Sequence, residues 1–333
     1  MPCRYVVGAF REDFDVKRLQ QVVLASAAAF LGIPVHATPA PIWADTKPAD
    51  LARIDDDVAR NIVREHFFDG INISEMRFSE NGFDWHLLRF ASIDKTDGPI
   101  WVVPHDDENA AFDAMISAVQ TYGGTGIAVN SGPGSARRQS GDGNCGVRPA
   151  RVTNCDPNRN FDSRAPIFTA VFVVLFQPDK PVIALHTNSI GFSGDGAGGR
   201  GDITIYDRAA FVRGEIKAAR NGQLAVNPLP EMANPDTFAL SAFIEASGAP
   251  PAKDVACGNA MTRSGVHFWH EPVRASDGSL SNYLSLNRPE ISYVNAESRM
   301  EVDLALAASR HAIMIKAYLE KCAASGDKPA AQP

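Results

Sequence analysis

A histidine and a glutamate three residues apart are the side chains in this sequence best placed to bind a metal. His105 and Glu108 directly follow the apolar run 99–104, which is typical of a short buried strand. An imidazole nitrogen and a carboxylate oxygen both suit Zn²⁺, and a catalytic zinc usually takes three protein ligands and leaves a fourth position for water. The spacing therefore predicts two ligands of a zinc site, and a third ligand must come from elsewhere.

His186 is the best candidate for the third ligand. It closes a second buried-strand pattern at 181–186, and ligand sites in open α/β sheets lie at the carboxyl ends of the strands. His267 and His270 form a possible second cluster. Residues three apart on a strand point to opposite faces, so we expect these two histidines to be a pocket rim or a surface pair.

The order of the motifs resembles that of the zinc carboxypeptidase superfamily, in which H-x-x-E is followed by an Asn-Arg pair, a strand-end His and a catalytic Glu. This resemblance implies that His105, Glu108 and His186 bind Zn²⁺. It also implies that Asn158 and Arg159 hold the terminal carboxylate of a substrate. The guanidinium of Arg suits that role because its planar fork of donors matches a carboxylate bidentately.

A nearby arginine is similar to one in the aspartoacylase and succinylglutamate desuccinylase branch of that superfamily. Arg151 lies five residues before Asp156, and the segment 185–188 also resembles this branch. The branch uses such an arginine to polarise the scissile carbonyl. The resemblance therefore implies this role for Arg151, with Arg148 as the competing choice.

The general base of the family lies in the last strand before the final helix, and Glu297 matches that position. The segment 291–296 alternates as a strand does, and a helical pattern follows from about 302 to 319. Glu290 and Glu301 remain alternatives. The resemblance covers roughly residues 95–320. The gap from Glu108 to His186 is shorter than in the digestive enzymes, so several surface loops should be trimmed.

We expect an α/β fold, with a mixed, mostly parallel central sheet flanked by helices on both faces, like that of the zinc carboxypeptidases. The periodicity of apolar residues predicts its elements. Strands are expected at 71–78, 85–90, 100–103, 126–130, 181–186 and 290–297, and helices at 49–68, 109–122, 167–176, 234–247 and 302–319.

The amino-terminal segment 1–37 is typical of a secretory signal peptide, because basic residues precede an apolar stretch and small residues follow it. An uncleaved anchor or a buried helix is the alternative. The rest of the chain is interpreted as a linker and the start of the catalytic domain at 38–95, a zinc hydrolase core at 96–322 and a disordered tail at 323–333. A periplasmic or secreted location follows from this interpretation.

The cysteines agree with export, because only Cys3 of the five lies in the leader. We expect a disulfide between Cys145 and Cys155 that fixes the loop carrying Arg151, and a second between Cys257 and Cys322. Four unpaired thiols in a cytosolic enzyme are the alternative.

The composition is that of a globular protein, with 45% hydrophobic and 21% charged residues among 333. The formal net charge is −7. A surface this acidic argues against nucleic acid or an anionic membrane as a partner.

The function predicted from these patterns is an exported Zn²⁺-dependent hydrolase that cleaves an amide bond adjacent to a free carboxylate, with a peptide or peptidoglycan peptide as substrate. An N-acyl amino acid deacylase of the same fold is one alternative. A non-catalytic peptide- or cell-wall-binding protein that keeps the fold is the other.

Overall fold

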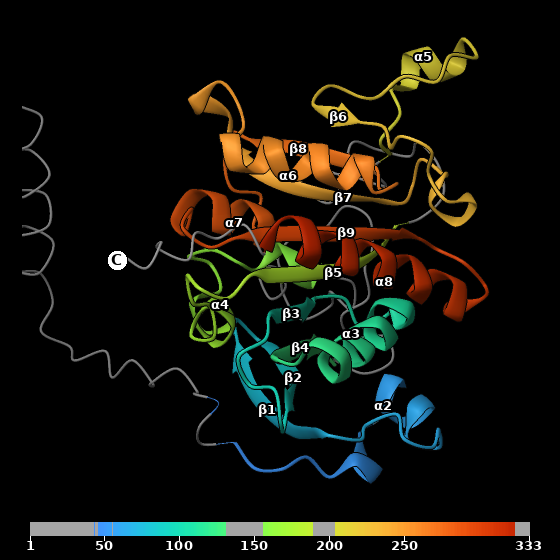
Figure 1. The fold of residues 1–333 in the computed structure, drawn as a ribbon. Helices are drawn as coiled ribbons and strands as arrows, with labels where there is room; N and C mark the ends of the chain where they lie inside the picture. Colours follow the sequence, from blue (N-terminus) through green and yellow to red (C-terminus); the bar gives the residue numbers. More distant parts are fainter. Residues whose placement is uncertain (1–42, 44–45, 55, 131–155, 189–203, 324–333) are drawn as a thin grey trace, which may run out of the picture. The chain divides into compact units, whose positions relative to one another are not determined.

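The computed structural model describes residues 43, 46–54, 56–130, 156–188 and 204–323, and Figure 1 shows their arrangement. Within these residues, one nine-stranded sheet has the strand order β1-β2-β4-β3-β5-β9-β7-β8-β6. Helices cover both of its faces, which confirms the predicted α/β class. None of the described helices is long and apolar enough to cross a membrane.

A long hairpin forms one margin of the sheet. The strands β1 (Ile71–Glu80) and β2 (Phe83–Ser92) are antiparallel over their whole length. Asn81 and Gly82 connect them, and both have positive φ, at 55° and 77°. A two-residue turn with both φ values positive matches the twist of paired strands, and Asn-Gly is its favoured sequence. The turn therefore fixes the register of the hairpin locally.

The centre of the sheet is parallel. The strands β4 (Thr125–Val129), β3 (Ile100–Val103), β5 (Val182–Asn188) and β9 (Tyr293–Arg299) pair in parallel in that order. Every residue of β3, β4 and β5 is buried, as expected for parallel strands with helices on both faces. The helix α3 (Asn109–Tyr122) links β3 to β4, and α4 (Pro166–Val173) precedes β5.

The other margin contains a strand where a helix was expected. Instead of a helix over 234–247, the chain forms β7 (Phe238–Ile244) and a 3-10 turn, η6 (Glu245–Ser247). This strand pairs antiparallel with β9 and parallel with β8 (Phe268–Val273), and the short edge strand β6 (Gly222–Gln223) pairs with β8. An apolar run this short fits the helical repeat and the strand repeat equally well, so pairing with β8 and β9 decides the structure of the segment.

The sequence also predicted one long helix over 49–68, and this prediction is wrong. The segment contains a 3-10 turn, η2 (Leu51–Arg53), and a short helix, α2 (Asp56–Asn61). His66 has a φ of 64°, which a right-handed helix does not allow. The charged side chains of the segment do not all face solvent: Arg60 lies 2.7 Å from Asp113 on α3.

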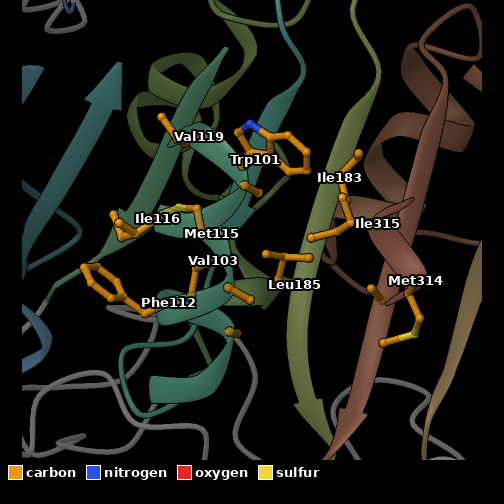
Figure 2. Packing of buried hydrophobic residues seen from close by; sticks show 14 of the residues in the cluster. Trp101, Val103, Phe112, Met115, Ile116, Val119, Ile183, Leu185, Met314 and Ile315 are labelled. Carbon is orange, nitrogen blue, oxygen red and sulfur yellow. The ribbon is translucent and has the colours of Figure 1, made fainter. Parts of the chain in front are cut away.

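Two apolar layers pack the sheet. On one face α3 and α8 (Leu304–Lys321) cover alternate residues of the central strands, and Figure 2 shows Met115 and Ile315 directed toward Val103 and Leu185. The helix α6 (Ala252–Arg263) contributes to the same layer through Met261. On the opposite face α4 and α7 (Leu280–Asn287) cover the other residues of the same strands. The short turn η5 (Pro230–Met232) adds Met232 to the first layer, and α5 (Arg208–Val212) contributes to neither.

A disulfide joins α6 to α8. Cys257 and Cys322 are bonded with their Cα atoms 5.0 Å apart, as the sequence analysis predicted for its second pair. Cys145 and Cys155, the first predicted pair, lie outside the described residues. The domain boundaries proposed from the sequence remain predictions.

Candidate metal centre and substrate site

Three buried side chains meet at the carboxyl edge of the parallel strands. His105 lies two residues beyond β3, Glu108 is the amino-terminal cap of α3, and His186 lies on β5. The strands β3 and β5 are adjacent and parallel, so residues at their carboxyl ends reach the same edge of the sheet. All three side chains are less than 5% exposed.

The donor atoms of these residues converge on one small space. Nδ1 of His105 lies 2.9 Å from a carboxylate oxygen of Glu108 and 3.1 Å from Nδ1 of His186. Nδ1 of His186 lies 3.5 Å from the other oxygen of Glu108. One donor atom from each residue lies within 4.8 Å of the others, and this group is the only one of its kind in the part of the chain described.

The electrostatics of the cluster fit a cation. Burial alone lowers the pKa of His105, but the carboxylates of Glu108 and Asp156 raise it to about 10. Burial likewise raises the pKa of Glu108, yet His105 and His186 hold it well below its usual range. Two imidazole nitrogens that face each other at 3.1 Å are satisfied only if a proton or a metal ion lies between them and the carboxylate. Two imidazole nitrogens and one carboxylate oxygen are also a donor set that suits Zn²⁺.

Asp156 fixes the orientation of His105. Its Oδ1 lies 2.8 Å from Nε2 of His105 and also accepts a hydrogen bond from the backbone N–H of Asn158. A carboxylate on the far nitrogen of a histidine sets its tautomer and raises its basicity toward a metal. The sequence analysis gave Asp156 no role. Its position two residues before Asn158 was the available signal.

The predicted carboxylate-binding pair lies beside this cluster. Asn158 and Arg159 belong to η3 (Pro157–Arg159), which Asp156 caps. Asp156 contacts both sites, because its other oxygen lies 3.6 Å from Nε of Arg159. The side-chain oxygen of Asn158 accepts a hydrogen bond from the N–H of Leu280, so Nδ2 is the part of this amide available to a ligand.

Glu297 lies next to His186 on the neighbouring strand. The two residues are register partners in the parallel pair β5–β9, so their side chains share one face of the sheet. Glu297 is 6% exposed; its Oε1 accepts from Asn295, and its Oε2 has no hydrogen-bond partner among the described residues. The rival acids are engaged elsewhere, because Glu290 pairs with Arg288 and Glu301 pairs with Arg310.

Of the two expectations for His267 and His270, a pocket rim or a surface pair, the structure contradicts the surface pair. Both side chains are buried, and neither belongs to the metal-binding group. Nδ1 of His267 accepts from the N–H of Ala225, and Nδ1 of His270 lies 3.1 Å from the Ser241 hydroxyl. These histidines therefore support the packing around β8. Arg148 and Arg151 lie outside the described residues.

A further buried imidazole adjoins the cluster and was missed from the sequence. His311 on α8 is fully buried, and its ring nitrogens have no hydrogen-bond partner in the described part of the chain. Burial lowers the pKa of His311 to about 3, against the effect of Glu108, which raises it. This ring is therefore neutral at physiological pH. The helical period placed it on the buried face of α8 but gave no sign of what it would meet there.

These features together have the composition of a metal-dependent hydrolase site: a histidine, glutamate and histidine group, an orienting aspartate, an uncommitted buried glutamate and a nearby arginine. No protein-family model matches the chain, and no curated protein matches it in sequence.

Solved structures do match the chain. One is a metallo-carboxypeptidase from Burkholderia cenocepacia, at 12% identity and a TM-score of 0.41, covering 80% of this chain and 69% of that one. Another is a succinylglutamate desuccinylase from a Silicibacter species, at 12% identity and 0.39, covering 76% and 67%. An ectoine utilization protein from Ruegeria pomeroyi matches at 14% identity and 0.37, covering 75% and 66%.

Proposed function

We propose that this protein is an exported Zn²⁺-dependent hydrolase that cleaves an amide bond adjacent to a free carboxylate. The observation that carries the proposal is the convergence of His105, Glu108 and His186 at one sheet edge, with the uncommitted carboxylate of Glu297 in register beside them. A purely structural cluster would not need a buried carboxylate oxygen without a partner, because such an atom destabilises the fold unless a ligand uses it.

His105, Glu108 and His186 would hold the zinc ion, and Asp156 would keep the ring of His105 in the binding orientation. Bound zinc supplies a Lewis acid that polarises a carbonyl and lowers the pKa of water toward ~7. Glu297 would accept a proton from the attacking water at Oε2 and return it to the nitrogen of the leaving amine. Arg151, with Arg148 as the alternative, would stabilise the negative charge that develops on the carbonyl oxygen.

Asn158 and Arg159 would bind the free carboxylate of the substrate, which places the scissile bond one residue away from it. This arrangement supports an exopeptidase on a peptide or peptidoglycan peptide. An N-acyl amino acid deacylase uses the same groups, and the spacing of Arg151 from Asp156 favours it as the second candidate. A periplasmic or secreted location remains part of the proposal and rests on the leader sequence alone.

The first experiment measures zinc and turnover in one preparation. Elemental analysis of the purified protein should give one zinc per chain, and His186→Ala should lose most of it. His66→Ala is the matched control, because His66 is exposed and pairs with Asp69, which is not part of the cluster. A His186→Ala protein that holds zinc as tightly as the parent would refute the ligand set. A zinc-loaded parent that hydrolyses no C-terminal peptide and no acyl amino acid would leave the binding-protein alternative.

The second experiment tests whether Arg159 binds the free carboxylate of the substrate. Amidating the carboxylate of a good substrate should reduce kcat/KM for the parent more than a change of one methylene in the neighbouring side chain, since an unpaired buried charge costs about 2 to 5 kcal/mol and a methylene ~1 to 3. Arg159→Lys should lose almost as much activity as Arg159→Ala, because an ammonium cannot make the two-pronged contact. If amidation reduces the activity of the parent and of Arg159→Ala equally, Arg159 does not bind the carboxylate.

A further inference from the structure

An exposed excursion of the chain between β5 and β7 carries apolar and basic side chains together. This arm, residues 207–217, includes α5 and the turn that follows it. Three of its apolar side chains face solvent: Phe211 is 46% exposed, Val212 79% and Ile216 70%. Figure 1 shows α5 beyond β6 and β8, clear of the helices that cover the sheet. Neighbouring exposed apolar side chains of this kind mark an interaction surface more often than isolated ones do.

The arm has a fixed local structure. Its ends are joined, because the N–H of Asp207 donates to the carbonyl of Lys217 at 2.8 Å. The carboxylate of Asp207 also caps α5 by accepting from the N–H of Ala210 at 2.7 Å. Gly214, with a φ of 79°, makes the turn after the helix, and its N–H donates to the carbonyl of Phe211 at 2.9 Å. Compact surface loops with joined ends are frequently functional.

The arm is basic although the chain is acidic. Residues 208–217 contain Arg208, Arg213 and Lys217 and one acid, Glu215, so their formal charge is 3 − 1 = +2, against −7 for the whole chain. All four charged side chains are exposed. Glu215 pairs with Arg213 at 3.1 Å, whereas Arg208 and Lys217 have no side-chain hydrogen bond or ion pair within the described part of the chain. Two cations are therefore available to an anionic partner.

Exposed aliphatic and basic side chains together fit the surface of an anionic bilayer. Cations are attracted to the headgroup phosphates, and aliphatic side chains are stabilised at the boundary between headgroups and acyl chains. A nucleic acid also offers phosphates, but it is bound through polar contacts and by stacking of bases on aromatic rings, and the most exposed apolar residues of the arm, Val212 and Ile216, are aliphatic. A symmetric contact between the arms of two copies would bring like charges together.

The net charge of the chain does not decide this contact. A net charge of −7 argues against an anionic membrane as a partner of the whole surface. Charges that lie farther from the bilayer than the Debye length, ~8 Å at physiological ionic strength, are largely screened. The local charge of the arm therefore governs its own approach to a surface.

The stretch that carries the arm is attached at the edge of the sheet where the metal centre lies. The N–H of Ile205, just before the arm, donates to the carbonyl of Pro235 at 2.9 Å. Nδ2 of Asn188, at the end of β5, donates to the carbonyl of Asp236 at 3.3 Å. Asn188 is two residues beyond His186. Contact through the arm would therefore hold this edge of the sheet close to the bilayer.

We propose that the arm binds the surface of an anionic phospholipid bilayer, with Val212 and Ile216 at the acyl boundary and the basic residues on the headgroup phosphates. The contact is peripheral and involves no membrane-spanning helix. It requires neither zinc nor turnover, so it is independent of the hydrolase proposal. If both hold, the substrates of the enzyme are amides held at a membrane surface.

The test is cosedimentation of the purified protein with phosphatidylcholine vesicles that contain or lack phosphatidylglycerol. We expect the parent to bind the anionic vesicles at least about tenfold more tightly, and added salt to weaken this binding. Arg208→Gln/Lys217→Gln should weaken it about 25-fold, at about fivefold for each cation. Val212→Ser/Ile216→Ser leaves the charge unchanged and should weaken it at least about tenfold. The amino-terminal segment is identical in all these proteins, so differences between them report on the arm.

Arg53→Gln/Val63→Ser is the matched control. It removes one exposed cation and one exposed aliphatic side chain outside the arm, and it should bind vesicles as the parent does. The thermal unfolding temperature of each variant shows whether it is folded.

Three results would overturn the inference. One is equal binding of the parent to both kinds of vesicle, or no binding to either. Another is binding that either arm variant leaves unchanged. The third is a parent that binds a single-stranded oligonucleotide, or forms a dimer in sedimentation velocity, through the same arm residues but does not bind anionic vesicles. Zinc content and turnover are measured separately, so failure of the hydrolase proposal would leave the vesicle result unaffected.

Discussion

The disulfide between Cys257 and Cys322 should contribute a large part of the stability of the carboxyl-terminal half. It connects α6 to α8 and closes a loop of 65 residues. Cross-linking restricts the unfolded chain more when the loop is longer, and the loop-entropy relation gives about 4 kcal/mol for this length. Replacing both cysteines by serine should lower the free energy of unfolding by about that amount. Both side chains are only half-buried, so the serine hydroxyls add little penalty of their own.

Urea unfolding followed by circular dichroism measures the effect. The oxidised parent should have the highest midpoint and the Cys257→Ser/Cys322→Ser protein a lower one. The parent treated with dithiothreitol should match that protein, or lie below it if a bridge between Cys145 and Cys155 is also reduced. The Cys145→Ser/Cys155→Ser protein is the matched comparison, and its shorter loop predicts a loss of about 2 to 4 kcal/mol if that bridge also forms. Equal midpoints for the oxidised and reduced parent, or titration of free thiols at 257 and 322 in denatured, unreduced protein, would refute the reasoning.

Three further predictions concern the site. Asp156→Asn should weaken zinc binding about 10- to 100-fold, because Nε2 of His105 loses its charged acceptor, and competition with a chelator measures this; undiminished affinity would remove Asp156 from the metal centre. Glu297→Gln should lower kcat by at least ~10²-fold with zinc still bound, and unchanged turnover would move the base elsewhere. The pKa of Glu271 on β8, which interacts electrostatically with Arg159, rises on folding, first through burial and then through Asp277, from 4.5 to about 7. The folded protein therefore binds the extra proton, and stability is lost as pH rises from about 4.5 to 7. The unfolding free energy of metal-free Glu271→Gln, minus that of the parent, should grow over this window by about 3 kcal/mol; a difference that stays constant with pH would contradict the shift.

The elements that carry the metal-binding motif could be predicted because their signals are local. The helix at 109–122 has the bounds given by its apolar period and by Gly123 after it. The apolar runs before His105 and at His186 are too short to form a helix, so a strand is the better prediction for both. Parallel pairing then brings the carboxyl ends of these two strands together. Once the motifs identified these strands as neighbours, the meeting of His105, Glu108 and His186 followed from topology alone.

The segment 234–247 could not be assigned in the same way. Its apolar residues suit either a helix or a strand, and only the partners β9 and β8 decide the matter, through residues far away in the sequence. The burial of His270 was not predictable either, because it depends on β7 and β6, which flank β8 and were not expected as strands.

The sequence by itself determined which chemistry is available. Side-chain type and spacing along one strand or one helix turn were enough to select candidate zinc ligands, a carboxylate-binding Asn-Arg pair and a general base. The tertiary structure alone decided which acids surround that pair. Asp277 reaches Arg159 because a loop with a left-handed glycine docks on η3. His311 reaches the metal cluster because α8 packs over β5 and α3. Such contacts join residues more than a hundred positions apart, and their free energies depend on the packing of whole layers, which no local pattern encodes.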